Sequence, residues 1–130
     1  MLTLRLPTRV FLCLLPTDMR KSFDSLAALV QSTMASDPLA GDLFVFKSKR
    51  GDRLKLLYWD GDGYALWYKR LEQGTFRFPE PAPGVTKQGQ AGLAIRAAEL
   101  VMLLDGVDLA SVTRQQRYQR PAPAPVSASA

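Results

Sequence analysis

The sequence predicts an α+β fold, a small antiparallel β-meander of three to four strands with helices packed on one face. Apolar residues between positions 19 and 34 recur at spacings of three and four, which indicates an amphipathic helix. Between residues 43 and 71, apolar and aromatic segments alternate with short loops rich in Gly and Asp, which are typical of β-hairpins. A helix followed by consecutive hairpins favours an α+β domain.

The expected elements follow one another along the chain. A buried strand covers residues 10–15, and Pro16-Thr17-Asp18 breaks this strand and supplies N-cap residues for the helix of residues 19–34. The strands of the meander are expected at residues 43–49, 53–59 and 64–71, with a short fourth strand at 75–78. A second helix is expected over residues 93–104, and Gly106 ends it.

The composition divides the chain into a domain and a tail. Hydrophobic residues make up 47% of the sequence, which is typical of a folded protein, and we expect residues 1–112 to form a single domain. Residues 113–130 are predicted to be a disordered tail, basic at first and then rich in Pro, Ala and Ser. A linker containing proline and glycine is expected at residues 79–89.

Charge and composition narrow the possible functions. The chain has 17 Lys plus Arg against 12 Asp plus Glu, a formal charge of +5, which favours a polyanionic partner such as nucleic acid. It has no histidine and one cysteine, so it cannot assemble a Ser-His-Asp or Cys-His relay or a structural zinc site. We therefore expect no catalytic residues, no cofactor and no metal.

The single cysteine and the N-terminal segment indicate the cellular compartment of the protein. Cys13 lies in an apolar segment of only six residues, 10–15, shorter than the apolar region of a signal peptide. No segment approaches the ~18 apolar residues of a membrane span. The sequence predicts a cytoplasmic protein without a membrane partner, in which Cys13 is a reduced core residue.

The segment from 43 to 59 carries the densest positive charge. If Arg50-Gly51-Asp52 is a three-residue loop, Lys47 lies opposite Lys55, and Lys49 lies opposite Arg53. A loop of two residues would place the lysines beside leucines, so the apolar alternation favours the first register. Directly opposed cations are destabilising by a few tenths of a kcal/mol. A polyanion would relieve this repulsion, although lysines on an edge strand also serve simply to prevent aggregation.

The next strand extends this predicted surface. With residues 60–63 as a four-residue loop, the side that bears Lys55 also carries these residues: Trp59, Tyr64, Leu66, Tyr68 and Arg70. Aromatic rings beside cations are typical of nucleic-acid platforms, in which rings stack on bases. Aromatic residues in strands are also common core residues, and Trp59 and Leu66 could be covered by the N-terminal strand or by a helix.

Two acidic features have competing interpretations. Asp60 and Asp62 could be a metal-binding pair, because two-metal nucleases use clustered carboxylates. Asp-Gly-Asp-Gly is also favourable turn chemistry, and no third acid follows at a recognisable spacing, so the turn interpretation is favoured. We interpret Arg50-Gly51-Asp52 as a hairpin tip, and its match to a cell-adhesion tripeptide as accidental.

Several segments of the chain together form a recognisable pattern. These segments are Thr17 to Val30, Leu43 to Phe46, Arg50 to Lys55, Tyr58 to Gly63, Trp67 to Glu72, Phe76 to Pro79 and Leu103 to Gly106. They resemble the insertion-sequence-66 family accessory protein, often called TnpB. The resemblance extends from residue 9 to about residue 108, with Ser22 in place of a glycine that is usual in the family.

The resemblance implies a small protein encoded beside a larger transposase and supporting movement of the element. The family is distinct from the RNA-guided nucleases that share the name TnpB. We expect the chain to bind DNA, with a separately encoded transposase as a second partner. The residues expected to contact phosphates are Lys47, Lys49, Arg50, Arg53, Lys55, Lys69, Arg70, Arg20 and Lys21.

A second hypothesis is a protein-interaction module that docks on the transposase without contacting DNA. The two hypotheses differ in the surface that they require. DNA binding needs an exposed and continuous basic face on the hairpin, whereas docking needs an apolar patch large enough to hold a protein. A third possibility, a metal-dependent nuclease, would depend on Asp60 or Asp62.

Overall fold

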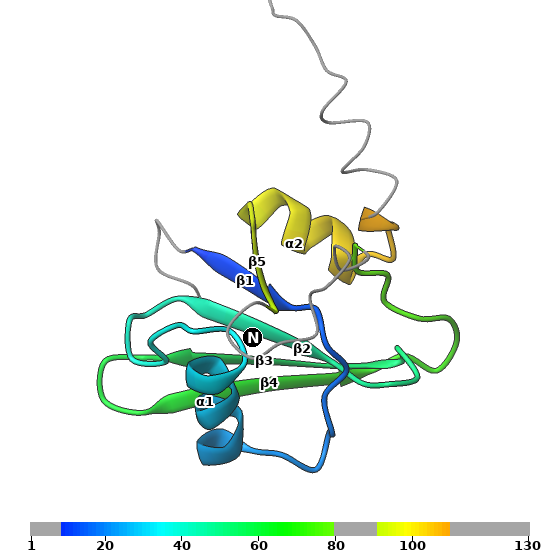
Figure 1. Cartoon of the computed structure of the whole chain (residues 1–130). Coiled ribbons are helices and arrows are strands. Elements are labelled where there is room, and N and C mark those ends of the chain that lie inside the picture. Colours follow the sequence, from blue (N-terminus) through cyan, green and yellow to red (C-terminus); the bar gives the residue numbers. More distant parts are fainter. Residues whose placement is uncertain (1–8, 80–90, 110–130) are drawn as a thin grey trace, which may run out of the picture.

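The computed structural model describes residues 9–79 and 91–109 (Figure 1), and over these residues the α+β prediction is confirmed. The predicted domain boundary at residue 112, the linker and the C-terminal tail lie outside the described residues, apart from Pro79. The elements are β1 (Val10–Cys13), α1 (Phe23–Ser32), β2 (Leu43–Lys47), β3 (Arg53–Trp59), β4 (Tyr64–Arg70), β5 (Gly92–Ile95) and α2 (Ala97–Leu104).

The strands form one five-stranded sheet in the order β4-β3-β2-β1-β5. The predicted antiparallel meander is present as β2-β3-β4. However, β1 pairs with β2 in parallel, joined to it by a crossover that contains α1, and β5 adds an antiparallel strand on the other side of β1. The sheet is therefore mixed and larger than the predicted three or four antiparallel strands, because the N-terminal strand and the segment before α2 both join it.

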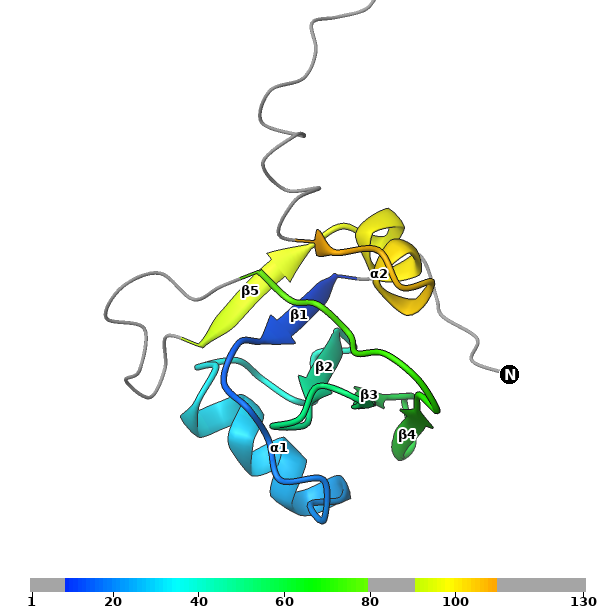
Figure 2. The ribbon, with the colours of Figure 1, turned by 90° about the vertical axis from the view of Figure 1, so that its right-hand side faces the viewer.

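The two helices lie on opposite faces of the sheet, and the prediction that helices share one face was wrong (Figure 2). On one face, α1 packs Leu26 and Val30 against a cluster that includes Phe44 of β2. On the other face, α2 packs Leu100 and Leu103 against a cluster that includes residues of β1, β2 and β3. Strands β2 and β3 are consequently buried on both sides, which requires apolar residues at successive positions.

The chain around α2 also departs from the prediction. The expected helix of residues 93–104 is divided, because β5 occupies its first part and pairs with β1 through residues 92–95. The helix then begins after Arg96, whose backbone N–H donates to Glu99 Oε1 at 2.8 Å and so satisfies one donor of the first turn. The expected fourth strand at 75–78 is absent from the described structure, although Phe76 and Phe78 are buried there.

The register of the β2–β3 hairpin differs from the predicted one by one residue. Phe46 lies opposite Lys55 and Lys47 lies opposite Leu54, so the loop contains four residues, 49–52, in place of three. The prediction assumed one apolar and one polar face. Because a helix covers each side of the sheet, both faces of the hairpin are apolar, and alternation alone cannot select the register.

The loop itself sets the observed register. Ser48 Oγ accepts hydrogen bonds from the backbone N–H groups of Gly51 at 3.2 Å and Arg53 at 3.1 Å. The Ser48 backbone N–H donates to Arg53 O at 3.0 Å, which closes the hairpin above the loop. Gly51 has a φ of +85°, in the left-handed region that favours glycine. These local bonds specify a four-residue loop.

We expect Gly51→Ala to destabilise the fold more than Gly61→Ala. Both glycines have positive φ, +85° and +84°, so each substitution introduces backbone strain of about 1–2 kcal/mol. A Cβ at residue 51 would also lie 3.3 Å from Thr75 Cβ, whereas a Cβ at residue 61 would meet nothing within 4 Å. Urea titration of the two variants measures the difference, and equal losses of stability would show that Thr75 moves aside without cost.

Candidate nucleic-acid interface

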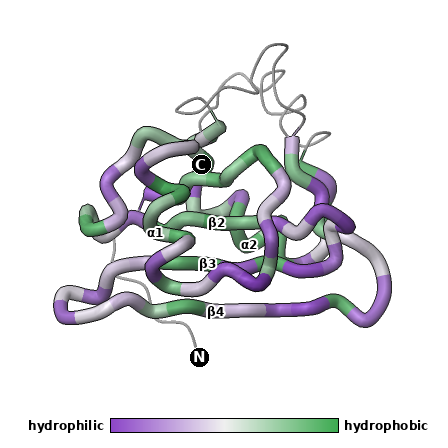
Figure 3. Tube along the Cα trace, turned by 60° about the horizontal axis from the view of Figure 1, so that its bottom comes forward, coloured by the Kyte–Doolittle hydropathy of each residue, from purple (hydrophilic) through white to green (hydrophobic). Residues whose placement is uncertain are grey.

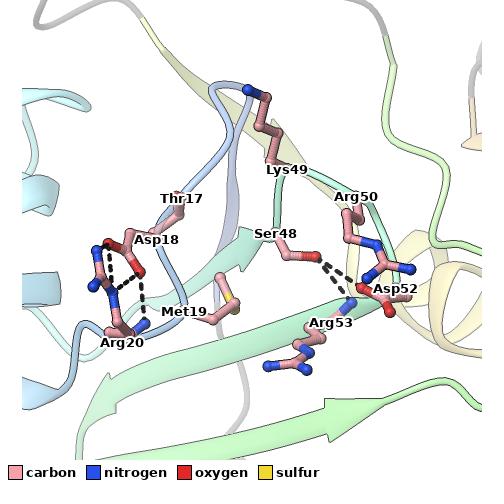
Figure 4. Close-up of a pocket in the computed structure, with 9 residues that line it drawn as sticks. All are labelled: Thr17, Asp18, Met19, Arg20, Ser48, Lys49, Arg50, Asp52 and Arg53. Carbon is pink, nitrogen blue, oxygen red and sulfur yellow. Dashed lines mark hydrogen bonds and ion pairs between the residues drawn. The ribbon is translucent and has the colours of Figure 1, made fainter.

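The loop before α1 and the loop of the β2–β3 hairpin meet at one end of the sheet. The Thr17 backbone N–H donates to Lys47 O at 2.9 Å, which fixes the first loop beside the second. Between them lies a hollow of about 360 Å³ (Figure 4). Its lining residues are Thr17, Asp18, Met19, Arg20, Ser48, Lys49, Arg50, Asp52 and Arg53. The hollow therefore joins two segments that are far apart in the sequence and contains four cations and two carboxylates.

One side of the hollow is an exposed ion pair. Arg20 Nη2 lies 2.6 Å from Asp18 Oδ2, and the Arg20 backbone N–H also donates to Asp18 Oδ1 at 2.9 Å (Figure 4). These hydrogen bonds hold the pKa of Asp18 well below its usual range and raise the pKa of Arg20. Asp18 is therefore ionised at neutral pH, and its charge partly cancels that of Arg20.

The hairpin loop supplies the other side. Lys49 and Arg50 are exposed, and neither side chain has a hydrogen-bond or ion-pair partner among the residues that the structure describes. Asp52 is held by Ser48, with 3.4 Å between Ser48 Oγ and Asp52 Oδ1. Arg53 points from the start of β3 and donates from Nη1 to the Tyr68 hydroxyl at 3.3 Å. Of the four cations in the hollow, Lys49 and Arg50 thus have no carboxylate or other acceptor among the described residues.

Lys55 lies elsewhere than predicted. Its side chain is buried, and its Nζ donates to Met19 O at 2.8 Å and to Lys21 O at 2.7 Å. The ammonium also lies 4.6 Å from the ring centroid of Tyr68. Lys55 therefore faces the interior on the α1 side and fixes the loop before α1. The expectation that it shares an exposed face with the other cations was wrong, because the one-residue change of register places Lys55 on the α1 side, opposite to that of Lys47, where the loop before α1 covers it.

The remaining predicted cations are dispersed. Lys47 points to the α2 side, where its ammonium lies 4.7 Å from the ring centroid of Phe78. Lys69 is exposed on that same side, opposite Leu54. Lys21 is half-buried, and its backbone carbonyl is one of the two that Lys55 binds. The structure thus brings only Arg20, Lys49, Arg50 and Arg53 of the predicted set together in the hollow.

The predicted opposed pairs, Lys47 with Lys55 and Lys49 with Arg53, do not form. The structure has a different like-charge pair, since Arg53 lies opposite Arg70 on β4. Arg70 is relieved by an exposed ion pair with Glu72, at 3.0 Å between Nη2 and Oε2.

The prediction that Trp59, Tyr64, Leu66, Tyr68 and Arg70 lie on the side of the sheet that bears Lys55 is confirmed, as the four-residue loop 60–63 required. Leu66 packs against the cluster under α1, which agrees with the core interpretation. Tyr68 differs, because it is 48% exposed.

Asp60 and Asp62 are exposed in the β3–β4 loop, which the Asp60 backbone N–H closes by donating to Gly63 O at 2.8 Å. The turn interpretation of these residues is therefore confirmed. Within residues 9–79 and 91–109, no group of three or more His, Cys, Asp or Glu side chains is placed to hold a metal ion. Over the same residues, no helix has the length and apolar character needed to cross a membrane.

The sequence prediction missed the two carboxylates of the hollow. Asp18 was interpreted only as an N-cap residue and Asp52 only as part of the hairpin tip, yet each stands beside a cation of the hollow. The available signal was proximity in sequence, because Asp18 is two residues from Arg20 and Asp52 is next to Arg53. Which loops approach one another could not be deduced, because it depends on the parallel pairing of β1 with β2.

The fold and the hollow define a small mixed-sheet α+β protein with a concave, cation-rich surface at one end. The chain matches the family described as IS66 Orf2 like protein over residues 8–114, and it belongs to that family. Family membership gives it an accessory role in an insertion sequence, as the resemblance in its sequence implied.

Two relatives come from Sinorhizobium fredii (strain NBRC 101917 / NGR234). The chain is 39% identical to the uncharacterized protein y4jC over 107 residues, which cover 82% of this chain and 86% of y4jC. It is 41% identical to the uncharacterized protein y4hO over 100 residues, which cover 77% of this chain and 81% of y4hO. No solved structure matches the chain with significant similarity.

We expect Lys55→Met to lower the free energy of unfolding by about 1–3 kcal/mol, because two backbone carbonyls lose a charged hydrogen-bond donor. Lys69→Met is the matched control, since Lys69 is exposed on the neighbouring strand and should change stability by less than about 0.5 kcal/mol. Chemical denaturation of both variants measures the two effects. If both variants match the parent protein, the carbonyls are satisfied by water and Lys55 does not fix the loop.

Proposed function

We propose that this protein is a non-catalytic accessory factor in DNA transposition that binds the DNA backbone in the hollow between residues 17–20 and 48–53. One observation carries the proposal. Four cations from two distant segments converge there, and the side chains of Lys49 and Arg50 have no partner among the described residues. Phosphate oxygens are suitable acceptors for both side chains, and Arg can bind phosphate through two parallel N–H groups.

The proposed contact predicts the character of binding. Backbone contacts position a protein on DNA without reading its sequence, so the hollow would supply affinity and register but not specificity. Each phosphate neutralised contributes a slope of about −0.9 in the dependence of log affinity on log salt. The small number of free cations therefore favours modest affinity and a shallow salt dependence.

The first test is binding of the Lys49→Gln/Arg50→Gln variant to element-end DNA and to scrambled DNA over a salt series. We expect weaker binding to both DNAs and a salt slope smaller by up to about two units, because two phosphate contacts are lost. Both side chains are exposed and unpaired among the described residues, so the fold should be unaffected. A preference of the parent protein for element ends would have to come from other residues.

A variant with the same change of charge outside the hollow is the control. Lys69 and Arg77 are exposed outside the hollow, and neither side chain has an ion-pair partner among the described residues, so Lys69→Gln/Arg77→Gln should bind nearly as the parent protein does. If both double variants lose affinity equally, only net charge matters and the hollow is not the site. If the parent protein binds neither DNA at low salt, the proposed DNA contact is wrong.

Removal of the Asp18 carboxylate provides a test in which DNA binding should become tighter. Asp18→Asn removes the negative partner of Arg20, and we expect tighter DNA binding by roughly two- to fivefold, the scale of one exposed ion pair. Asp24→Asn is the control. Asp24 is exposed in the first turn of α1, so its substitution makes the same change of charge outside the hollow. Equal gains from the two variants would again indicate a general charge effect.

The alternative function, docking on the transposase, is favoured by a different surface. Val101 on α2 is 59% exposed, and Ala97 and Ala98 are exposed on the same helix. An apolar helix surface of this kind suits a protein partner better than DNA. A parent protein that binds purified transposase but no DNA would establish this alternative in place of the first proposal.

A further inference from the structure

Tyr68 is an aromatic side chain exposed near the end of an edge strand. It is 48% exposed, although most aromatic residues of the described chain are buried or half-buried. Strand β4 forms the edge of the sheet, and its second half is hydrophilic and exposed (Figure 3). Tyr68 thus lies in the exposed half of the edge strand.

The ring of Tyr68 is held on two sides. Lys55 Nζ lies 4.6 Å from the ring centroid, and this ammonium is itself fixed by Met19 O and Lys21 O. Arg53 Nη1 donates to the Tyr68 hydroxyl at 3.3 Å. One face of the ring therefore lies against a buried cation, and 48% of the residue remains exposed to solvent. A ring whose orientation is already set loses little conformational freedom when a flat ligand stacks on it.

Cations flank the ring along the sheet. Arg53 and Arg70 lie opposite each other on β3 and β4, on the same side as Tyr68, and Arg70 is two residues further along the strand. Arg53 also lines the hollow. Cations therefore extend from the hollow to the sheet edge on either side of the exposed Tyr68 ring, and the outermost of them, Arg70, is paired with the exposed Glu72.

We propose that Tyr68 stacks on an unpaired nucleobase of a single-stranded DNA segment whose backbone runs past Arg53 and Arg70. This inference rests on the proposed DNA binding in the hollow. Base–aromatic stacking is available to every base, so it would distinguish unpaired from paired DNA without reading sequence. A duplex offers no free base face except at its ends, and so would use the hollow alone.

The experiment compares fluorescence anisotropy titrations of a labelled oligothymidine and a labelled blunt duplex of equal length. We expect Tyr68→Ala to weaken binding of the single strand by about 5- to 100-fold and to leave duplex binding within about twofold, since only the single strand loses its stacked base. Tyr68→Phe keeps the ring and should bind the single strand nearly as the parent does. Tyr68→Leu keeps apolar bulk without an aromatic face and should resemble Tyr68→Ala.

The possible failures are distinguishable. Duplex binding that is lost in Lys49→Gln/Arg50→Gln, together with single-strand binding that is unchanged in Tyr68→Ala, would overturn the stacking proposal and retain the hollow. Equal weakening of both DNAs by Tyr68→Ala would also overturn it, because the ring would then act only by supporting Arg53. A parent protein that binds neither DNA would overturn both proposals. Thermal unfolding of each variant shows whether the fold is retained.

Discussion

The burial of β2 and β3 on both faces is the constraint on which the rest of this structure depends. With α1 packed on one side and α2 on the other, successive residues of β2 from Leu43 to Phe46 must be apolar, and the chain meets this requirement. Charged residues are then excluded from the middle of the sheet, except where a side chain finds internal partners. They collect instead at the hairpin loop and along the second half of β4. The hollow and the exposed end of β4 are joined through Arg53, which lines the hollow and lies opposite Arg70.

Lys55 is the exception within the sheet, and it explains how the exposed end is organised. Burying an ammonium is costly unless charged hydrogen bonds compensate for the lost hydration. Two backbone carbonyls of the loop before α1 and the face of the Tyr68 ring provide that compensation. One side chain thereby links the loop that carries Arg20, the strand that begins at Arg53, and the edge strand β4. A lysine that was predicted to contact phosphate instead positions residues that can do so.

Much of the fold could be predicted from the sequence, because local signals decide it. The N-terminal strand, the amphipathic helix and the three strands of the meander are all present, since periodicity and turn chemistry report them directly. The register of the β2–β3 hairpin could not be predicted, because Leu56 and Leu57 are both buried and alternation carries no information there. Strand β5 was missed for a related reason: Leu93 and Ile95 fit a strand and a helix equally well over so short a segment. The four cations of the hollow were among the nine predicted from charge, whereas its two carboxylates and the approach of its two loops depended on tertiary pairing.

The charge balance of the hollow bears on what an accessory protein of this size could contribute. The hollow has two carboxylates beside its four cations, so it would neutralise few phosphates. So small a number of phosphate contacts gives weak binding at physiological salt. Weak, sequence-independent DNA contacts are sufficient when a second partner supplies the remaining affinity. Two linked binding events give a higher overall affinity than either one alone, without any new contact. On this argument, the DNA and transposase hypotheses are complementary. The basic end of the sheet would hold DNA loosely, and the apolar surface of α2 around Val101, at the other side of the sheet, would remain free for a protein. A protein that bound DNA tightly by itself would not need that second surface.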